Sequence, residues 1–437
     1  MQILVYTEVI TPRVTYIFNH ILSQILGFDV IFTQDKSYVS SFSGPVVNYS
    51  TQNNLGSFQV IPHQLLFEEG IESQQFDFFT WRNLPAFFPT DNTHEIPFDI
   101  FAASFFLISR YEEYLPHEAD KYKRFRVENS VAYWNGFLEI PLVDLWIVEF
   151  GEILKQKFPS AQIILPPFKF LPTIDIDNAF AYKHKGFFRS LAGIVKSTLS
   201  LNILDLHLRL RVIFGFSKDP FDTYLLLFET LKHFPQTIWF ILGGKYGRYD
   251  KNVSLKRTRV KKLIRKISST FNVGVHPSFA SYLSYDSVNS EILRLKSICR
   301  NEVASSRQHF LRVKFPETYR ILVQAGIKSD YSMGYSSTVG FRASTCHPFN
   351  FFDLTENREL SLSIVPFQVM DRALLEGKNL SKELAVDKTI EIAMKVKEVG
   401  GTFVTVWHNE SLSGVNEWKG WENVFSEIVD KIVTQQN

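Results

Sequence analysis

The chain has 437 residues, more than one hydrophobic core usually organises, so two domains are expected. Hydrophobic residues make up 45% and charged residues 21%, which excludes a disordered or fibrous chain. The 47 Lys and Arg nearly balance the 45 Asp and Glu, so the overall charge gives no support to binding of nucleic acid. Phe occurs 41 times, which predicts a core or cleft walls rich in aromatic rings.

The two cysteines, Cys299 and Cys346, exclude a disulfide scaffold and a zinc site of the four-cysteine type. The N-terminus lacks the basic region of a signal peptide, since its first positive side chain is Arg13. No apolar run reaches the ~18 to 20 residues of a membrane-spanning helix. We therefore expect a cytoplasmic protein.

The first part of the chain mixes short strands and helices. Apolar periodicity predicts a strand over 1–7, a helix over 14–26, a β-rich stretch over 29–61 and a buried helix over 98–114. The segment Leu165-Pro-Pro-Phe168 then marks the predicted domain boundary, because consecutive prolines stop regular structure. Residues 1–165 are expected to form a smaller α/β domain of unknown role, and residues 166–437 a second domain.

Short apolar runs alternate with amphipathic helical stretches in the second part. This alternation predicts a mostly parallel sheet, and the six or seven units are nearer a distorted barrel than a full eight-fold one. The predicted strands are 170–176, 237–242, 272–276, 305–310, 361–369 and 402–408, and the predicted helices are 221–233, 255–268, 287–299 and 382–399.

Titratable residues follow several of these strands, at the edge where parallel α/β folds gather their chemistry. Asp175 and Asp177 project from the same face of the first strand and repel unless a cation or a proton lies between them. A single Asp or His after a strand is often structural, as a cap or a buried polar residue. His276, His309 and His408 nevertheless follow three further strands, and imidazole with carboxylate is the ligand set of a catalytic zinc-like ion.

The order of these motifs resembles the polysaccharide deacetylase family (NodB-homology, carbohydrate esterase). Over about 171–411 the chain has Thr-x-Asp-x-Asp ending at Asp177, His276-Pro-Ser, Arg307-x-His309 and a late strand ending in His408. It is most similar to a divergent branch from bacterial surface-polysaccharide gene neighbourhoods, which has an extra N-terminal domain. The segment Ser109-Arg-Tyr-Glu-Glu-Tyr, with Asp120 and Arg124 downstream, resembles that domain.

The resemblance implies a distorted (β/α)7 barrel of the polysaccharide deacetylase type, preceded by the smaller α/β domain. It also implies removal of N- or O-acetyl groups from a sugar with the help of a divalent metal ion, expected to be zinc, with cobalt or nickel as alternatives. Residue by residue, it gives Asp175 as general base, Asp177 and His276 as metal ligands, Arg307 as the arginine that orients the base, Asp330 as the aspartate that tunes the catalytic acid, and His408 as that acid.

Two departures from the family pattern concern the metal. Ile176 separates the two aspartates, which are usually adjacent, and Ala280 replaces the second histidine of the His-x-x-x-His pair. Our hypothesis is that His309, where the family usually has proline, supplies the missing ligand. The alternative is a weak or inactive site with two protein ligands.

Substrate contacts are expected in loops after the strands. The segment 243–252 resembles a phosphate loop loosely but lacks the Gly-Lys-Ser/Thr ending, so it is either a substrate-side loop or a plain loop. The candidate substrate-binding residues are Tyr246, Asp250, Arg342 and Trp407.

Two basic segments have simpler explanations than a ligand. Segment 256–266 is an amphipathic helix with a solvated basic face. Segment 183–216 is basic and rich in Phe, Leu and Ile; it could lie against a membrane surface, although a role as partner helix or core is favoured.

The sequence thus predicts a metal-dependent deacetylase that acts on a bacterial surface polysaccharide or its precursor, with an acetylated carbohydrate as partner. Two alternatives stay open: a non-catalytic carbohydrate-binding relative, and a glycosidase on a similar barrel. Peripheral membrane association is possible, nucleic acid is not expected, and the oligomeric state does not follow from the sequence.

Overall fold

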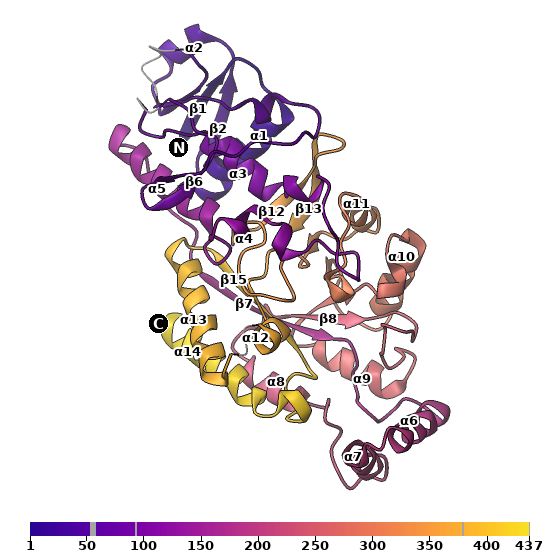
Figure 1. The fold of residues 1–437 in the computed structure, drawn as a ribbon. Helices are drawn as coiled ribbons and strands as arrows, with labels where there is room; N and C mark the ends of the chain where they lie inside the picture. Colours follow the sequence, from indigo (N-terminus) through magenta and orange to yellow (C-terminus); the bar gives the residue numbers. More distant parts are fainter. Residues whose placement is uncertain (53–57, 92–93, 378–379, 437) are drawn as a thin grey trace.

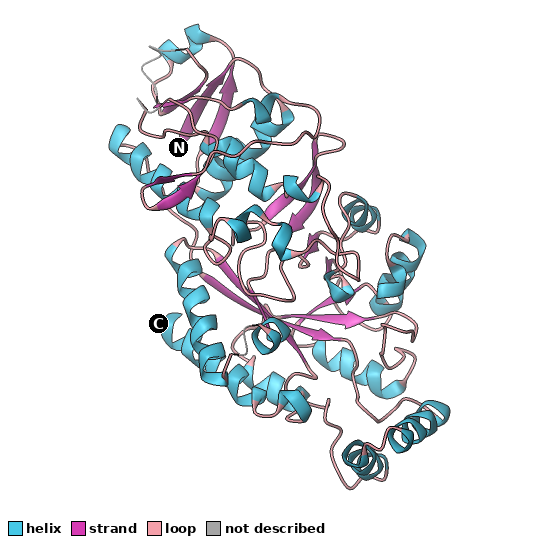
Figure 2. Cartoon of the chain, in the orientation of Figure 1, coloured by secondary structure: helices cyan, strands magenta, loops and turns pink. Residues whose placement is uncertain are grey.

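A computed structural model of the chain describes residues 1–52, 58–91, 94–377 and 380–436. It is a mixed α/β structure in which the N-terminal part builds a small sheet and the remainder a large one (Figures 1 and 2). The N-terminal elements are β1 (Gln2–Thr7), α1 (Pro12–Phe18), the π-helix η1 (Asn19–Ile25), β2 (Asp29–Thr33), α2 (Lys36–Ser41), β3 (Val46–Tyr49), β4 (Phe58–Val60), η2 (Gln64–Phe67), β5 (Phe79–Trp81), β6 (Leu84–Ala86), α3 (Ile100–Ile108), η3 (Tyr111–Glu113), η4 (Val127–Asn129), α4 (Val131–Trp134) and α5 (Leu142–Lys157).

The small sheet is parallel, in the order β2-β1-β3-β4. The helix predicted over 14–26 starts earlier, because the side chain of Thr11 caps it and Pro12 suits the first turn. The helix predicted over 98–114 ends at Ile108, and Arg110 then takes a left-handed φ of 54°. The β-rich stretch contains three short strands and α2, and its residues 53–57 lie outside the described residues.

The second part of the chain alternates strands with helices as its pattern predicts. Its elements are β7 (Lys169–Ile176), α6 (Phe187–Leu199), α7 (Ile203–Ile213), α8 (Tyr224–Thr230), β8 (Ile238–Leu242), α9 (Thr258–Ile267), β9 (Asn272–His276), η5 (Phe279–Ser281), α10 (Tyr285–Lys296), β10 (Ser305–Ser306), η6 (His309–Leu311), α11 (Glu317–Gln324), β11 (Ser329–Asp330), β12 (Phe349–Asp353), β13 (Arg358–Ile364), β14 (Val369–Met370), α12 (Asp371–Glu376), α13 (Lys382–Glu398), β15 (Thr402–His408), η7 (Asn416–Trp418) and α14 (Trp421–Gln436).

The large sheet has nine strands in the order β12-β13-β11-β10-β9-β8-β7-β15-β14. All neighbours pair in parallel except β12 and β13, which form an antiparallel hairpin. Within the described ranges, no strand pairing joins β14 to β12 or β13, so hydrogen-bonded pairing alone does not close the large sheet. No helix in the described part of the chain is both long and apolar enough to cross a membrane.

Two strand predictions were wrong in extent. The strand predicted over 305–310 stops at Ser306, because the chain turns at His309 and Phe310 adopts a left-handed φ of 61°. The strand predicted over 361–369 is divided into β13 and β14, which lie at opposite sides of the sheet order. By contrast, β9 and β15 have the predicted bounds.

The N-terminal part packs against the β12–β13 hairpin through aromatic side chains. The ring of Phe352 in β12 lies 5.0 Å from that of Tyr16 in α1 and 5.1 Å from that of Phe105 in α3. The hydroxyl of Tyr16 also donates to the carbonyl of Asn350 at 2.7 Å. The excess of phenylalanine therefore serves, at least in this region, to join the two parts of the chain.

Candidate metal centre and active site

Polar side chains from several strands meet at one edge of the large sheet. The parallel strands β10, β9, β8, β7 and β15 are neighbours in this order, so their carboxyl ends lie together. Asp175 lies near the end of β7, His276 ends β9, and His408 ends β15 in register with Asp175. Residues that are far apart in the sequence thereby converge.

Asp177, His276 and His309 form a group that could hold a metal ion. Their ligand atoms all lie within 4.8 Å of one another. The Nε2 atom of His276 lies 3.2 Å from Oδ1 of Asp177, and the Nε2 atom of His309 lies 3.4 Å from Oδ2. One carboxylate and two imidazoles leave a coordination position open, as catalytic zinc sites do.

Hydrogen bonds fix which nitrogen of each histidine faces this group. The Nδ1–H of His276 donates to the carbonyl oxygen of Arg307 at 2.5 Å, and the Nδ1–H of His309 donates to Oδ1 of Asp250 at 2.9 Å. A carbonyl and a carboxylate can only accept, so both Nε2 atoms are free to offer a lone pair when the rings are neutral. Such outer hydrogen bonds orient metal-ligating histidines.

The donor set fits a divalent cation. Oδ1 of Asp177 is buried and has no hydrogen-bond partner, which is costly for a carboxylate unless a cation is bound. Burial opposes ionisation of Asp177, but the neighbouring His309 and His276 outweigh it and hold the pKa of its carboxyl well below the usual range. Asp177 therefore offers an anionic oxygen without a hydrogen-bond partner beside two imidazole nitrogens.

The position of Ala280 explains how the site differs from the His-x-x-x-His pattern. The backbone N–H groups of Phe279 and Ala280 donate to Asp250 at 2.8 and 3.1 Å, and the same carboxylate accepts from His309. The segment around 280 thus anchors Asp250, and Asp250 in turn orients His309. The structure places His309 where our hypothesis needs it, whereas its role as a metal ligand stays a prediction.

Asp175 is held by a buried arginine. Nη1 of Arg307 donates to Oδ1 of Asp175 at 2.7 Å and to the hydroxyl of Thr173 at 2.8 Å, while its Nε donates to the carbonyl of Tyr331 at 2.9 Å. Arg307 and Asp175 are 0% and 1% exposed, so this charge-assisted pair is well shielded from water. Oδ2 of Asp175 lies 3.9 Å from Nε2 of His276, next to the candidate metal group.

His408 is paired with Asp371, a residue outside the motifs described in the sequence analysis. Nδ1 of His408 lies 2.9 Å from Oδ1 of Asp371 in α12, and Nε2 lies 4.0 Å from Oδ2 of Asp177. Burial lowers the pKa of His408, but Asp371 outweighs it and raises the pKa to about 10. The pairing follows from the sheet order, because β14, which precedes Asp371, pairs with β15.

The structure does not place Asp330, the aspartate expected to tune the acid, beside His408. Asp330 is fully buried and accepts hydrogen bonds from the hydroxyl of Ser306 at 2.7 Å and from the N–H of Ser332 at 2.9 Å. Burial raises the pKa of its carboxyl, which these hydrogen bonds only partly offset. It fixes the segment that carries Arg307 and has no hydrogen bond or ion pair with His408.

One cavity of about 430 Å³ is lined by Asp175, Asp177, His276, His309 and His408. The N-terminal part of the chain contributes to its wall through Tyr122 and Arg124. Nη1 of Arg124 donates to the carbonyl of Phe310 at 2.9 Å, and Nε donates to Asp120 at 2.7 Å. Phe310 has a left-handed φ that costs a non-glycine residue about 1 kcal/mol or more. Arg124 therefore braces the turn that presents His309.

Two of the predicted substrate-binding residues are occupied elsewhere. Arg342 forms a bidentate pair with Glu113, with Nε–Oε1 and Nη2–Oε2 distances of 2.9 and 2.6 Å, so it joins the two parts of the chain. Trp407 is buried against Phe425, with ring centroids 5.0 Å apart. Side chains alternate along a strand, so Trp407 faces away from the cavity that His408 faces.

The other two residues predicted to contact substrate, Tyr246 and Asp250, are not among those that line this cavity. Tyr246 does not line the cavity; its ring lies 3.8 Å from the guanidinium of Arg189 in α6. Asp250 is buried and orients His309, with a pKa that His309 and the backbone donors lower against the effect of burial. The cavity instead presents Arg372, Glu376 and Glu410 beside the candidate catalytic groups.

A second group of potential ligands, Asp144, Cys346 and His347, is less suited to a metal. The carboxylate of Asp144 already accepts from the hydroxyl of Thr345 at 2.6 Å and from the N–H and thiol of Cys346 at 2.7 and 3.0 Å. Burial, followed by Asp144, raises the pKa of the Cys346 thiol well above its usual value. The thiol therefore stays protonated, and the group ties α5 to the second part of the chain.

Comparison with known proteins gives limited similarity. A model of a family of unknown function, DUF7033, matches residues 3–159. No curated protein matches the chain. The similar solved structures include a protein from Mycobacterium smegmatis assigned as a polysaccharide deacetylase (13% identity, TM-score 0.40, covering 61% of this chain and 84% of that chain). They also include the polysaccharide deacetylase Bc1974 from Bacillus cereus, with 10% identity and a TM-score of 0.31 over 61% of this chain and 88% of that chain. A third is the Xyl-CE4 domain of a multidomain xylanase from the hindgut metagenome of Trinervitermes trinervoides, with 8% identity and a TM-score of 0.30 over 62% of this chain and 84% of that chain.

Proposed function

We propose that this chain is a metal-dependent carbohydrate deacetylase that removes N- or O-acetyl groups from a bacterial surface polysaccharide or its precursor. One observation carries the proposal. A single cavity holds a three-ligand group, Asp177, His276 and His309, between a carboxylate fixed by Arg307 and an imidazole fixed by Asp371. Hydrolysis of an acetyl group needs an electrophile, a base and an acid in this mutual arrangement.

A divalent ion held by Asp177, His276 and His309, zinc in the first place and cobalt or nickel as alternatives, would polarise the acetyl carbonyl and acidify an attacking water. Asp175 accepts the proton of that water, because its free Oδ2 faces the ligand group. Arg307 donates to the other oxygen of Asp175, and the hydrogen bond from the same Nη1 to Thr173 helps to fix the guanidinium and with it the orientation of the carboxylate.

His408 donates a proton to the leaving nitrogen or oxygen. Asp371 accepts from its Nδ1–H and holds the imidazolium form, so that Nε2–H is available toward the cavity. The general base and the general acid thus come from the paired strands β7 and β15, on which Asp175 and His408 are in register.

We also propose that residues 166–437 form a distorted (β/α)7 barrel around this site and that residues 1–165 form a separate α/β domain. The alternation of strands and helices and the irregular segment 161–168 support this division. The contact of Arg124 with the turn at Phe310 gives the N-terminal domain a part in shaping the site.

The test combines metal analysis with acetate release. The purified protein should contain about one transition metal ion per chain and release acetate from acetylated xylan or from N-acetylglucosamine oligomers. Dialysis against a chelator should abolish the release, and added zinc should restore it. Hydrolysis of glycosidic bonds unaffected by chelator would support a glycosidase instead, and a metal-free protein that binds these sugars without turnover would support a non-catalytic relative.

A further inference from the structure

The helices α6 and α7 form a hairpin that projects from the molecule on the side away from the N-terminal part (Figure 1). Its outward side chains are apolar. Phe188 and Leu204 are each 84% exposed, and the stripe Phe188, Leu191, Val195 and Leu199 follows one face of α6 at helical spacing. In the described chain this is a large unpartnered apolar surface, whose exposed members are Phe187, Phe188, Leu191, Val195, Leu199, Leu201, Ile203, Leu204, Phe214 and Phe216.

The hairpin is polar on its inner side. Asp205 of α7 accepts hydrogen bonds from the hydroxyls of Ser197 and Tyr182 and from Arg209 at 3.2 Å. Asp219 accepts from three successive backbone N–H groups, of residues 181, 182 and 183, at 2.7 to 2.9 Å and so fixes the base of the hairpin. The hairpin is therefore a structured element with polar contacts inside and apolar side chains outside, whereas helices usually bury their apolar side chains and expose their polar ones.

The surroundings of this surface are strongly basic. Segments 183–222 and 255–268 together contain 14 Lys and Arg and three acidic residues, Asp205, Asp219 and Asp222, whereas the rest of the chain has 33 Lys and Arg against 42 Asp and Glu. This end of the molecule thus carries a large positive charge on a chain that is nearly neutral overall. Two copies would repel each other if these faces met, so the charge argues against self-association there.

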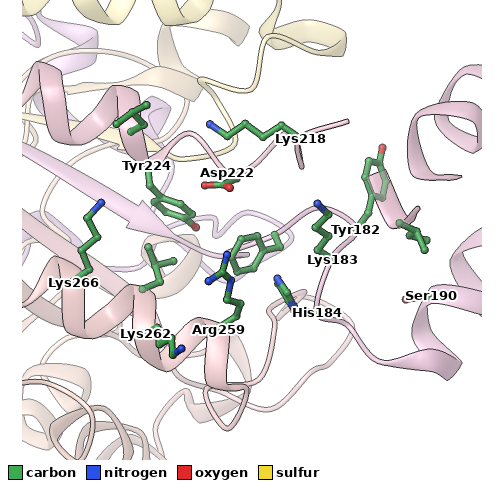
Figure 3. Close-up of a pocket in the computed structure, with 14 residues that line it drawn as sticks. Tyr182, Lys183, His184, Ser190, Lys218, Asp222, Tyr224, Arg259, Lys262 and Lys266 are labelled. Carbon is green, nitrogen blue, oxygen red and sulfur yellow. The ribbon is translucent and has the colours of Figure 1, made fainter. Parts of the chain in front are cut away.

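A pocket of about 830 Å³ lies at the base of the hairpin, between it and α9 (Figure 3). Its lining includes Lys183, His184, Lys218, Arg259, Lys262 and Lys266, and one carboxylate, that of Asp222. Burial and the nearby Arg259 lower the pKa of His184, and burial with Arg189 and Arg209 lowers that of the neighbouring Lys185 to about 8. Each cation makes protonation of its neighbours less favourable, so an anion placed among them would be stabilised.

We propose that the α6–α7 hairpin docks the protein on an anionic lipid bilayer, with its apolar face inserted among the acyl chains and the basic pocket and α9 against the phosphate headgroups. Exposed aromatic and aliphatic side chains beside a dense basic surface are the combination that binds such interfaces. The proposal does not depend on the proposed function. It has a consequence for the active site, because Arg189 of α6 donates to the carbonyl of Asn252 at 2.9 Å, in the loop that carries Asp250. A docked hairpin would hold that loop close to the membrane surface.

The experiment measures co-sedimentation of the full chain with vesicles of phosphatidylcholine alone and with vesicles that contain 30% phosphatidylglycerol. We expect binding to the anionic vesicles, at least ten-fold weaker binding to the neutral ones, and loss of binding in 0.5 M salt. Equal binding to both vesicle types would overturn the electrostatic part, and absence of binding to either would overturn the proposal.

Two variants separate the two contributions. Phe188→Ser/Leu204→Ser removes exposed apolar side chains, and Lys262→Glu/Lys266→Glu reverses charge at the pocket; each should weaken binding to anionic vesicles at least ten-fold. The matched controls Leu293→Ser/Leu384→Ser and Lys36→Glu/Lys157→Glu alter exposed residues elsewhere and should bind as the parent does. If the parent is a dimer that Phe188→Ser/Leu204→Ser dissociates while vesicle binding is unchanged, the surface is an interface between two copies and the proposal is wrong.

Discussion

Nδ1 of His408 lies 2.9 Å from Oδ1 and 3.0 Å from Oδ2 of Asp371, and the backbone N–H of His408 donates to the same carboxylate at 2.8 Å. Asp371 is fully buried, so this double contact fixes the imidazole ring and holds it in the cationic form. The orientation and the protonation state of His408, the acid of the proposed reaction, therefore depend on Asp371 at the start of α12.

Replacement of Asp371 by Asn should shift the pH dependence of acetate release. The pKa of His408 is raised to about 10, so the protonated acid is present below that pH and is lost as pH rises through it. Without the carboxylate the pKa falls, and the alkaline limb of kcat/KM should move about 1 to 3 pH units lower. Asp330→Asn is the comparison, because it should leave the alkaline limb in place. A shift in that variant alone would show that Asp330, and not Asp371, raises the pKa of His408.

Replacement of Asp175 by Asn should separate catalysis from metal binding. Loss of the base should reduce kcat by about 10²- to 10⁴-fold, while the metal content stays that of the parent, since Asp175 lies beside the ligand group and not in it. Single-turnover acetate release and elemental analysis measure the two effects. Full activity in this variant would remove Asp175 from the mechanism.

Replacement of Asp250 by Asn should weaken the metal site through His309. Asp250 accepts the Nδ1–H of His309, and loss of such an outer partner typically costs 10- to 100-fold in metal affinity. Competition with a chromogenic chelator gives the affinity. The exposed Asp286 provides the matched control, Asp286→Asn, and an equal affinity in both variants would show that His309 does not need this carboxylate.

Replacement of Arg124 by Ala tests the contribution of the N-terminal part. The change removes the hydrogen bond to the carbonyl of Phe310, so the turn that presents His309 should relax and metal affinity should fall by about 10-fold or less. Arg126→Ala removes an arginine of the same segment that pairs with Glu118 and Glu128 at the surface, and should behave as the parent. Indistinguishable affinities in the two variants would contradict the bracing role.

The ends of β9 and β15 were predictable from the sequence, because each strand is a short apolar run that ends in a histidine. β9 and β15 have the predicted bounds, and this alone brings His276 and His408 to one edge. The same alternation could have excluded Trp407, which precedes His408 and must face the other way. The turn at His309 had no such signal, because it depends on left-handed φ values at Phe310 and Leu311.

Partners distant in the sequence account for most of the errors. Arg342 was predicted to contact substrate, yet Glu113, 229 residues away in the sequence, forms a bidentate ion pair with it. Likewise, the order of the strands, which no local pattern reports, places Asp371 and not Asp330 beside His408. Local periodicity specifies elements, whereas the pairing of buried charges depends on the assembled sheet.

The most direct test of this account is a crystal structure of the protein grown with zinc, with diffraction data collected on both sides of the zinc absorption edge. The account predicts one anomalous peak per chain that is within bonding distance, about 2.0 to 2.2 Å, of Asp177, Nε2 of His276 and Nε2 of His309. A peak at Asp144, Cys346 and His347 instead, or none at the first group, would contradict it.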